Sequence, residues 1–320
     1  MNPKVYDTII IGGGPAGCAA AVYTARKKLR TLLLTEDFAG QSISAAAIEN
    51  WIGDRLISGI DLAKKLENHV RAYPEIDIIT SAPVVAVSEA SACFFDVVAK
   101  GGEIFRTRSI IAAAGARRRR LGVPGEAELE GRGVAFCSTC DAPFFQDSNV
   151  AVVGSGNAAL ETVIDLLPFA KDIYLLLRGD NLKGDAVTRD RATSSPRVTL
   201  ITNVVVEAIL GEKSVTGLSY RDIGNRELRE LSVDGVFVEI GSVPNSEFLR
   251  DLVATNESGE ITVDHKTAET SKPGIFAAGD VTSDPFKQNN IAAGDGIRAA
   301  LSAYNHVLNI KKHSPCAESL

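Results

Sequence analysis

The sequence predicts an α/β protein with two doubly wound, three-layer nucleotide-binding domains, the second inserted into the first. Two observations support this prediction. An apolar strand, a glycine-rich turn and an alanine-rich helix follow one another over residues 6–26, and the same order returns from Ala151. Two short connections, residues 115–124 and 241–245, contain glycine and proline and bracket the second copy.

The length and composition agree with two packed domains. The chain has 320 residues, of which 45% are hydrophobic and 23% charged, the balance of an ordinary globular protein. The connections predict that residues 1–117 and 247–320 form the first domain and residues 118–246 the inserted one. The run Arg117–Arg120 in the first connection is expected to be a solvated surface turn rather than a docking patch for a partner.

Charge and apolar runs exclude two classes of partner. With 34 Lys and Arg against 40 Asp and Glu, the net charge is −6, so no overall basic field exists for a nucleic-acid backbone. No apolar stretch approaches the ~20 residues of a membrane helix. Five cysteines are too few for a secreted disulfide scaffold, and the chain starts directly with an apolar strand. We expect a soluble, unprocessed, cytoplasmic protein without nucleic-acid or membrane partners.

The first glycine turn has the spacing of a dinucleotide-binding loop. In this pattern Gly12 permits the tight turn, Gly14 lets the backbone approach a pyrophosphate, and Gly17 lets the following helix pack closely. The N–H groups and positive dipole of that helix then receive the phosphate without a cation. A second predicted strand, residues 31–35, ends at Glu36, whose carboxylate can accept hydrogen bonds from a ribose.

The second unit and the end of the chain continue the same alternation. The turn at residues 154–159 opens another helix rich in Ala and Leu, and residues 173–177 read as the next strand. Near the end of the chain, residues 274–280 read as a strand that ends in an acid, followed by a polar loop and a helix from about residue 290 to 308.

Two cysteines three residues apart, Cys137 and Cys140, precede the second glycine turn and can close a small redox disulfide. The main alternative is structural zinc, which needs four ligands, and the other cysteines and four histidines do not have that spacing. The sequence therefore favours redox chemistry and predicts no metal. Cys18 is expected in a buried helix, Cys93 as a small core or surface residue, and Cys316 in a polar tail without a redox role.

With these motifs in place, the sequence resembles the low-molecular-weight thioredoxin reductase family, and particularly the flavoprotein portion of bacterial alkyl hydroperoxide reductase, over nearly the whole chain. The resemblance implies a homodimeric FAD-dependent disulfide reductase that delivers electrons to thioredoxin or a similar small dithiol protein. The segments that support it occur in the family's order: Gly12–Gly17, Gly40-Gln41 with Ile48–Trp51, Cys137–Asp141, Gly154–Ala159, and Gly279-Asp280 with Lys287-Gln288 and Gly294–Gly296.

The resemblance also implies which residues hold FAD. Its pyrophosphate would lie on the first glycine turn, its ribose at Glu36, its ribityl chain at Asp280, and its isoalloxazine near Gln41, Asn50 and Gln288. The implied FAD residues are Gly12, Gly14, Pro15, Ala16, Gly17, Glu36, Gly40, Gln41, Asn50, Gly115, Gly279, Asp280, Gln288 and Asn289.

The same resemblance implies a role for each residue of the redox motif. Cys140 would be the thiol that faces the flavin, and Cys137 the thiol that attacks the substrate disulfide. Asp141 would be the acid–base group beside them. Two thiols are needed because exchange passes through a mixed disulfide, so one sulfur must reach the partner while the other resolves it.

The electron donor stays open at this point. The resemblance implies possible NAD(P) contacts at Gly154, Gly156, Asn157, Ala159, Arg178 and Lys183. NADPH-using relatives carry a His-Arg-Arg run after the following strand, whereas this chain has Leu177-Arg178-Gly179. Leu177 is also not the acid expected for the ribose of NADH.

Three hypotheses remain for the electron path. NADH or NADPH is favoured slightly, with a modest preference for NADH. A ferredoxin-type protein, as in family branches without the arginine signature, is the second hypothesis. A dithiol oxidase that uses oxygen, or a nucleotide sensor, is the third, although the intact Cys-x-x-Cys-Asp motif argues against a pure sensor.

Overall fold

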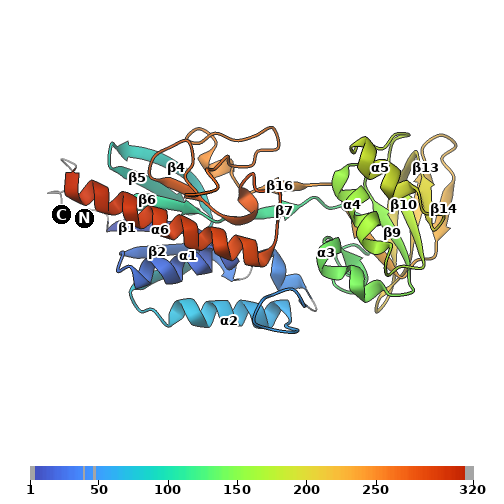
Figure 1. Ribbon diagram of the computed structural model, residues 1–320, viewed down its shortest axis with the longest axis horizontal. Helices are drawn as coiled ribbons and strands as arrows, with labels where there is room; N and C mark the ends of the chain where they lie inside the picture. Colours follow the sequence, from blue (N-terminus) through green and yellow to red (C-terminus); the bar gives the residue numbers. More distant parts are fainter. Residues whose placement is uncertain (1–3, 39, 46–47, 314–320) are drawn as a thin grey trace. The chain divides into compact units, whose positions relative to one another are not determined.

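The computed structural model describes residues 4–38, 40–45 and 48–313, and they divide into two compact units (Figure 1). The second unit comprises Ile48–Asn50 and Arg118–Ser242, and the rest of the described chain forms the first. The second unit thus ends at Ser242, four residues before the predicted boundary. Asn245 belongs to the first unit because its backbone N–H donates to the Gly115 carbonyl at 2.9 Å and its side chain to the Ala114 carbonyl at 2.8 Å.

The first unit is built on a seven-stranded sheet in the order β3-β2-β1-β6-β5-β4, with β17 also paired to β6. Strands β3, β2, β1 and β6 run parallel, as predicted for a doubly wound domain, whereas β5 and β4 run antiparallel. One edge of β6 is shared, with β5 on its first half and β17 on its last residues. The bounds are β1 (Val5–Gly13), β2 (Thr31–Phe38), β3 (Ile76–Thr80), β4 (Val84–Ser91), β5 (Phe94–Ala99), β6 (Ile104–Ala112) and β17 (Ile275–Ala277).

Side chains alternate between the two faces of this sheet and create two cores. On one face Ile10 and its neighbours meet small residues of α1 and α6, including Ala20 and Ala303. These alanines let the two helices lie side by side, as Figure 1 shows. On the other face Ile9 and Ile11 pack under β5 and residues 249–263. The helical elements are α1 (Pro15–Arg26), α2 (Gly59–Arg71), α6 (Asn289–His313) and the short 3₁₀ turns η1 (Gly40–Ser44), η3 (Glu247–Leu249) and η4 (Gly279–Val281).

The second unit also has three layers. Its central sheet is fully parallel in the order β11-β10-β9-β15-β8. One face packs against α4 and α5, and the other against an antiparallel sheet, β12-β13-β14, instead of helices. The strands are β8 (Val134–Ala135), β9 (Asn149–Val153), β10 (Asp172–Leu176), β11 (Val198–Ile201), β12 (Val204–Gly211), β13 (Val215–Asp222), β14 (Leu228–Leu231) and β15 (Gly235–Val238), and the helical elements are α3 (Ser138–Asp141), η2 (Ala142–Phe145), α4 (Asn157–Leu166) and α5 (Ala186–Thr193).

The two connections pair as short strands, β7 (Ala116–Arg118) and β16 (Ser242–Pro244). The arginine run is solvated, as predicted, but its first two residues belong to β7 and not to a turn. Arg117 forms an ion pair with Glu247 at 2.7 Å, and Arg120 forms one with Glu130 at 2.6 Å.

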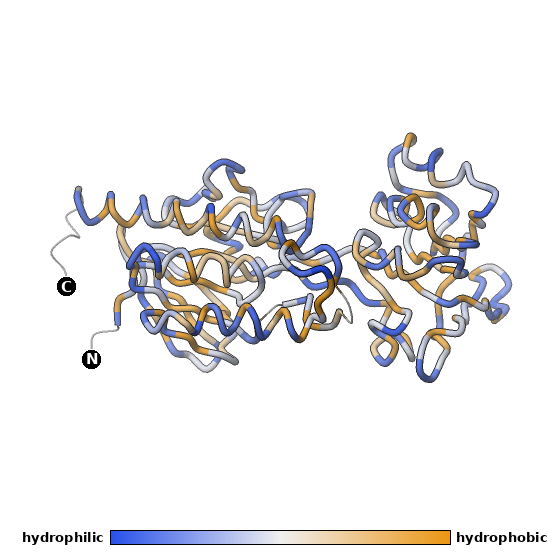
Figure 2. Tube along the Cα trace, turned by 60° about the horizontal axis from the view of Figure 1, so that its bottom comes forward, coloured by the Kyte–Doolittle hydropathy of each residue, from blue (hydrophilic) through white to orange (hydrophobic). Residues whose placement is uncertain are grey.

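The hydropathy of the chain follows this architecture. Figure 2 shows hydrophobic stretches along the strands inside each unit and hydrophilic segments in many of the outer loops. Helix α2 illustrates the pattern, since Leu62 and Val70 are buried whereas Lys64 and Lys65 are exposed. Within the part of the chain that the structure describes, no helix combines the length and apolarity needed to span a membrane.

Candidate functional site

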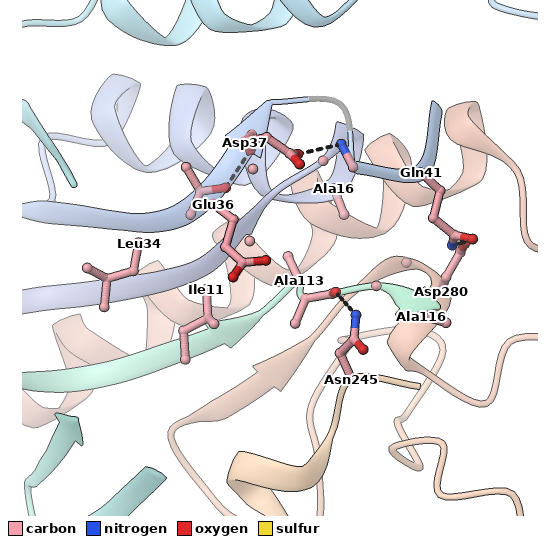
Figure 3. A pocket seen from close by; sticks show the side chains of 18 of the residues that line it. Ile11, Ala16, Leu34, Glu36, Asp37, Gln41, Ala113, Ala116, Asn245 and Asp280 are labelled. Atoms are coloured by element: carbon pink, nitrogen blue, oxygen red, sulfur yellow. Dashed lines mark hydrogen bonds between the residues drawn. The ribbon is translucent and has the colours of Figure 1, made fainter. Parts of the chain in front are cut away.

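A cavity of about 530 Å³ lies in the first unit, where β1, β2, β6 and β17 reach their carboxyl ends (Figure 3). Ligands bind at this edge in doubly wound sheets, and the volume is within the usual range of about 300–1,000 Å³ for small-molecule sites. Most of the predicted FAD residues line it: Gly12, Gly14, Pro15, Ala16, Glu36, Gly40, Gln41, Gly115, Gly279, Asp280 and Asn289.

The first glycine turn leaves no room for side chains where it touches the sheet. Gly12 has φ +110°, and a Cβ on it would lie 2.2 Å from the Ala113 carbonyl oxygen. A Cβ on Gly17 would lie 1.8 Å from the Gly12 oxygen. At Gly14, in contrast, no atom lies within 4 Å of that position, and no side chain caps α1 at this residue. The N-terminus of α1 therefore opens into the cavity and is suited to receive a phosphate.

Acidic side chains at the end of β2 lie around the cavity. Glu36 is exposed near the end of this strand, and Figure 3 shows its carboxylate directed into the cavity. Its neighbour Asp37 accepts a hydrogen bond from the Gly40 backbone at 3.1 Å and so fixes the start of η1. Across the cavity, the Gln41 amide donates to Asp280 at 3.4 Å. An acid at the end of the second strand is the group expected for a ribose.

The cavity wall includes residues that sequence reasoning missed. Asn245 lines it, and its side chain accepts from Arg117 at 2.7 Å. Residues 82–85 form another part of the wall and carry no recognisable motif. In the sequence, only the position of Asn245 in the connection at residues 241–245 could have pointed to it. Three predicted residues are not in the lining: Gly17, which packs the turn, Gln288, which begins α6 by accepting from Ala292, and Asn50.

These features fit the dinucleotide FAD that the resemblance implies. A pyrophosphate needs close backbone approach, and the open position at Gly14 beside the uncapped start of α1 allows it. A ribose needs an acceptor, and Glu36 provides it. The fit depends on the open position at Gly14, which a larger residue would fill.

The cysteine pair is held at the start of α3 in the second unit. Cys137 and Cys140 are joined as a disulfide, with their Cα atoms 5.3 Å apart. The Cys137 carbonyl accepts from the backbone of Cys140 at 3.2 Å and of Asp141 at 3.0 Å, which closes the turn. Between the cysteines, the buried Ser138 donates to Asp165 of α4 at 2.8 Å. The disulfide therefore sits on a turn fixed to the unit's core.

Asp141 comes directly after the disulfide and is half-buried. Burial raises the pKa of its carboxyl from 3.8 to about 6. A carboxyl that gains and loses a proton near neutral pH is suited to acid–base work beside thiols. Near the disulfide, the Asn50 amide lies 3.8 Å from the Cys140 sulfur. The structure thus groups Asn50 with the disulfide's unit rather than with the first cavity.

The second glycine turn repeats the geometry of the first. A Cβ on Gly154 would lie 2.3 Å from the Glu239 carbonyl oxygen, whereas Gly156 has nothing within 4 Å. Gly156 also begins α4 without a side-chain cap. Ala159 is fully buried where the first turn has Gly17. The start of α4 is therefore also suited to receive a phosphate.

The segment after β10 folds back onto this second turn. The Lys183 backbone donates to the Ser155 carbonyl at 2.7 Å, and the Asp185 backbone donates to the Asn157 side-chain oxygen at 2.9 Å. Asn157 thus has a structural task, and its side-chain oxygen is already occupied. Arg178 and Lys183 are exposed.

Of the other described cysteines, Cys18 is a free thiol. Cys18 is buried, as predicted, and its thiol donates to the Gly13 carbonyl at 3.1 Å. Burial raises the pKa of this thiol to about 12, so it stays protonated. Cys93 is buried between β4 and β5, and Cys316 lies outside the described residues. Across the residues that the structure describes, no group of three or more His, Cys, Asp or Glu is placed to hold a metal.

Comparison with known proteins agrees with this arrangement. Residues 6–304 match the family described as pyridine nucleotide-disulphide oxidoreductase. Thioredoxin reductase from Streptococcus pyogenes superposes with a TM-score of 0.89 at 34% identity, over 95% of this chain and 99% of that one. A subunit of alkyl hydroperoxide reductase from Pseudomonas putida is 42% identical over 96% of this chain. A Bacillus subtilis protein named NADH dehydrogenase is 40% identical over 96% of this chain. The chain spans 59% and 60% of these two relatives' lengths.

Proposed function

Since the chain belongs to the pyridine nucleotide-disulphide oxidoreductase family, we propose that it is an FAD-dependent reductase of protein disulfides that uses NADH. Family membership implies a flavin and a pyridine nucleotide. The observation that supports the activity best is the Cys137–Cys140 disulfide followed by the half-buried acid Asp141. In the same chain, the first unit contains a cavity suited to a dinucleotide.

The proposed FAD site uses the first glycine turn, Glu36 and Asp280. The N-terminus of α1 would hold the pyrophosphate at Gly14, and Glu36 would accept from the ribose. Bound there, the flavin would supply two electrons from a nicotinamide to the disulfide. The chain's own task in this unit is to hold the group through backbone N–H groups and two carboxylates.

The cysteine pair would carry out the exchange with the substrate. In the dithiol state, the Cys137 thiolate attacks one sulfur of the substrate disulfide, forms a mixed disulfide and releases the other substrate sulfur. Cys140 then attacks Cys137, which restores the Cys137–Cys140 bond and releases the second substrate thiol. Asp141 would accept the proton that leaves Cys140 and return it in the next cycle.

The second glycine turn would bind the nicotinamide dinucleotide, with Gly156 at its pyrophosphate. Arg178 and Lys183 provide two exposed cations, but not the planar arginine cluster that grips a 2′-phosphate. An NADH preference agrees with the name of the B. subtilis relative. Because an acid at the end of β10 is missing, we expect the preference to be modest.

The proposed oxidant is a thioredoxin-like protein. This chain covers 99% of the S. pyogenes thioredoxin reductase but only 59% of the P. putida hydroperoxide reductase protein. We propose a small dithiol protein as the substrate because the S. pyogenes relative is a thioredoxin reductase, and a peroxiredoxin as the second candidate because of the alkyl hydroperoxide reductase relatives. We further propose a homodimer, from the resemblance to the reductase family.

An anaerobic reduction experiment tests the donor and the partner. The oxidised protein is mixed with NADH or NADPH while the flavin absorbance is followed. Fast bleaching by NADH, followed by reduction of added thioredoxin, is the expected result. No bleaching by either coenzyme, with reduction by photoreduced ferredoxin, would replace the donor. Oxygen uptake with small dithiols would instead favour a dithiol oxidase.

A further inference from the structure

The turn that carries Asp280, η4, is held by the side chain of one lysine, Lys287. The ammonium group of this lysine donates to the backbone carbonyl of Asp280 at 3.4 Å and also to the carbonyl of Thr282. It forms an ion pair with Glu260 at 3.0 Å. Because an ammonium group has three N–H donors, these three acceptors can use all of them.

The lysine and its carboxylate partner lie behind the turn and not in the cavity. Asp280 lines the cavity, whereas Lys287 and Glu260 are not among the described residues of its wall. Their side chains are only 23% and 22% exposed, so solvent weakens this ion pair less than a pair on the open surface. The pair is therefore placed to act on the backbone of the turn rather than on a ligand.

Glu260 is itself fixed in place. The Asn256 side-chain amide donates to the Glu260 carboxylate at 2.7 Å, and its oxygen accepts from the Glu260 backbone at 3.0 Å. The next residue, Ile261, donates to the Val281 carbonyl at 2.9 Å and accepts from the Ser283 backbone at 2.9 Å. The carboxylate that pairs with the lysine thus belongs to a segment bonded directly to η4.

The start of the turn is fixed in a different way, by close packing. Gly279 has φ +75°, and a Cβ on it would lie 3.2 Å from the Cβ atoms of Ala16 in α1 and Ala292 in α6. Its carbonyl accepts from the backbone of Thr282 at 2.9 Å and from the hydroxyl of the same residue at 2.8 Å. Lys287 therefore adds its bonds at the carbonyls that follow this packed glycine.

We propose that Lys287, fixed by Glu260, is a positioning residue that sets the place of the Asp280 carboxylate for the ribityl chain of FAD. This inference rests on the proposed function, in which Asp280 holds part of the flavin nucleotide. Lys287 bonds to the Asp280 backbone and does not touch the ligand. A backbone that is already held loses less freedom when the ligand binds, so the affinity is higher.

A merely structural role for Lys287 would give a different result. If the lysine only stabilised the fold, its loss would weaken FAD binding equally with and without the Asp280 carboxylate. If it acts through Asp280, its loss should matter only while that carboxylate is present. A double-mutant cycle of Lys287→Met and Asp280→Ala separates these two roles.

The test uses the full-length flavin-bound protein and measures the dissociation constant of FAD from the fluorescence released on dilution. Lys287→Met should raise this constant about tenfold, as expected when a hydrogen bond to a charged group is lost. In Asp280→Ala protein, the same change should alter it less than about twofold. Lys272→Met is the matched control and should leave it unchanged. Lys272 forms a similar ion pair with Glu89 at 2.6 Å and is 28% exposed, and neither residue is among the described residues of the cavity wall.

Two outcomes would overturn the proposal: a constant unchanged by Lys287→Met, or one raised equally in both backgrounds. If Lys287→Met fails to fold, Glu260→Gln replaces it, because the lysine then keeps its two carbonyl partners and loses the carboxylate. An increase of about threefold is expected from Glu260→Gln, and none in Asp280→Ala protein, with the same two outcomes against the proposal.

Other results separate this inference from the proposed function. An Asp280→Ala protein that binds FAD as tightly as wild type would refute the role of Asp280 in the flavin site, and the role of Lys287 with it. Failure of NADH to bleach a bound flavin would refute the proposed donor and leave this inference standing.

Discussion

The two glycine turns have nearly the same backbone geometry in different surroundings. In each, the first glycine lies against the carbonyl of a neighbouring strand, at 2.2 Å for Gly12 and 2.3 Å for Gly154 when a Cβ is placed on it. In each, the glycine before the helix, Gly14 or Gly156, faces open space. The shared geometry is what a helix end needs to receive a phosphate, so the turns alone do not distinguish two ligands.

The difference lies in the residues that come after each turn. After the first, β2 ends at Glu36, which points into the cavity. After the second, β10 is followed by the buried Leu177, and Lys183 and Asp185 are bonded back to the turn. The comparison teaches that this chain repeats the backbone geometry of the glycine turn and varies the residues that follow it.

The strongest test of the comparison is to block each turn separately. Gly14→Val should abolish FAD binding, because the side chain fills the open position over the end of α1. Gly156→Val should leave the flavin bound and abolish its reduction by NADH. Flavin content per chain and anaerobic bleaching measure the two effects. Gly294→Ala, at another open glycine, is the control and should change neither. Stoichiometric flavin in Gly14→Val would refute the assignment.

The third position of each turn, Gly17 in the first and Ala159 in the second, allows the two turns to be compared by protein stability. Gly17→Ala places a Cβ 1.8 Å from the Gly12 oxygen, and we expect it to lower the free energy of unfolding by about 3 kcal/mol. The reciprocal change, Ala159→Gly, should cost only about 1 kcal/mol through lost helix propensity. Chemical denaturation of both variants measures the effects. Equal losses would show that the two turns pack alike.

The sequence predicted the fold more completely than the site. Both strand–turn–helix units and the disulfide could be predicted because glycine spacing and Cys-x-x-Cys are local patterns. Asn245 and residues 82–85 could not, because they reach the cavity through tertiary packing without a motif.

The residues after β10 provide a gain-of-function prediction. Gly179 has no atom within 4 Å of a Cβ position, so an arginine fits there without strain. Gly179→Arg would place a planar cation beside Arg178 and should raise kcat/KM for NADPH about tenfold relative to NADH. Gly179→Ser is the control, because it adds bulk without charge. If both variants give the same coenzyme ratio, the donor site does not lie at the end of β10.

The smallest expected effect is on protein stability and comes from the burial of a carboxyl. Glu36 in the first unit is exposed, whereas Asp141 in the second unit is half-buried. Burial raises the pKa of Asp141 from 3.8 to about 6, so folding favours its protonated form. Below pH 4 this carboxyl is protonated in both folded and unfolded chains and has no differential effect. As the pH rises from 4 to 6, the unfolded chain ionises first, and the folded protein loses stability up to the folded pKa.

Asp141→Asn should remove this pH-dependent cost. Because the side chain is only half-buried, we expect the variant to gain about 1–2 kcal/mol relative to wild type on going from pH 4 to pH 7.5. Urea unfolding of both proteins across this pH range measures the difference. A pH-independent difference would mean that burial does not hold the proton on Asp141, and the acid beside the disulfide would then ionise well below the pH at which it is proposed to transfer protons.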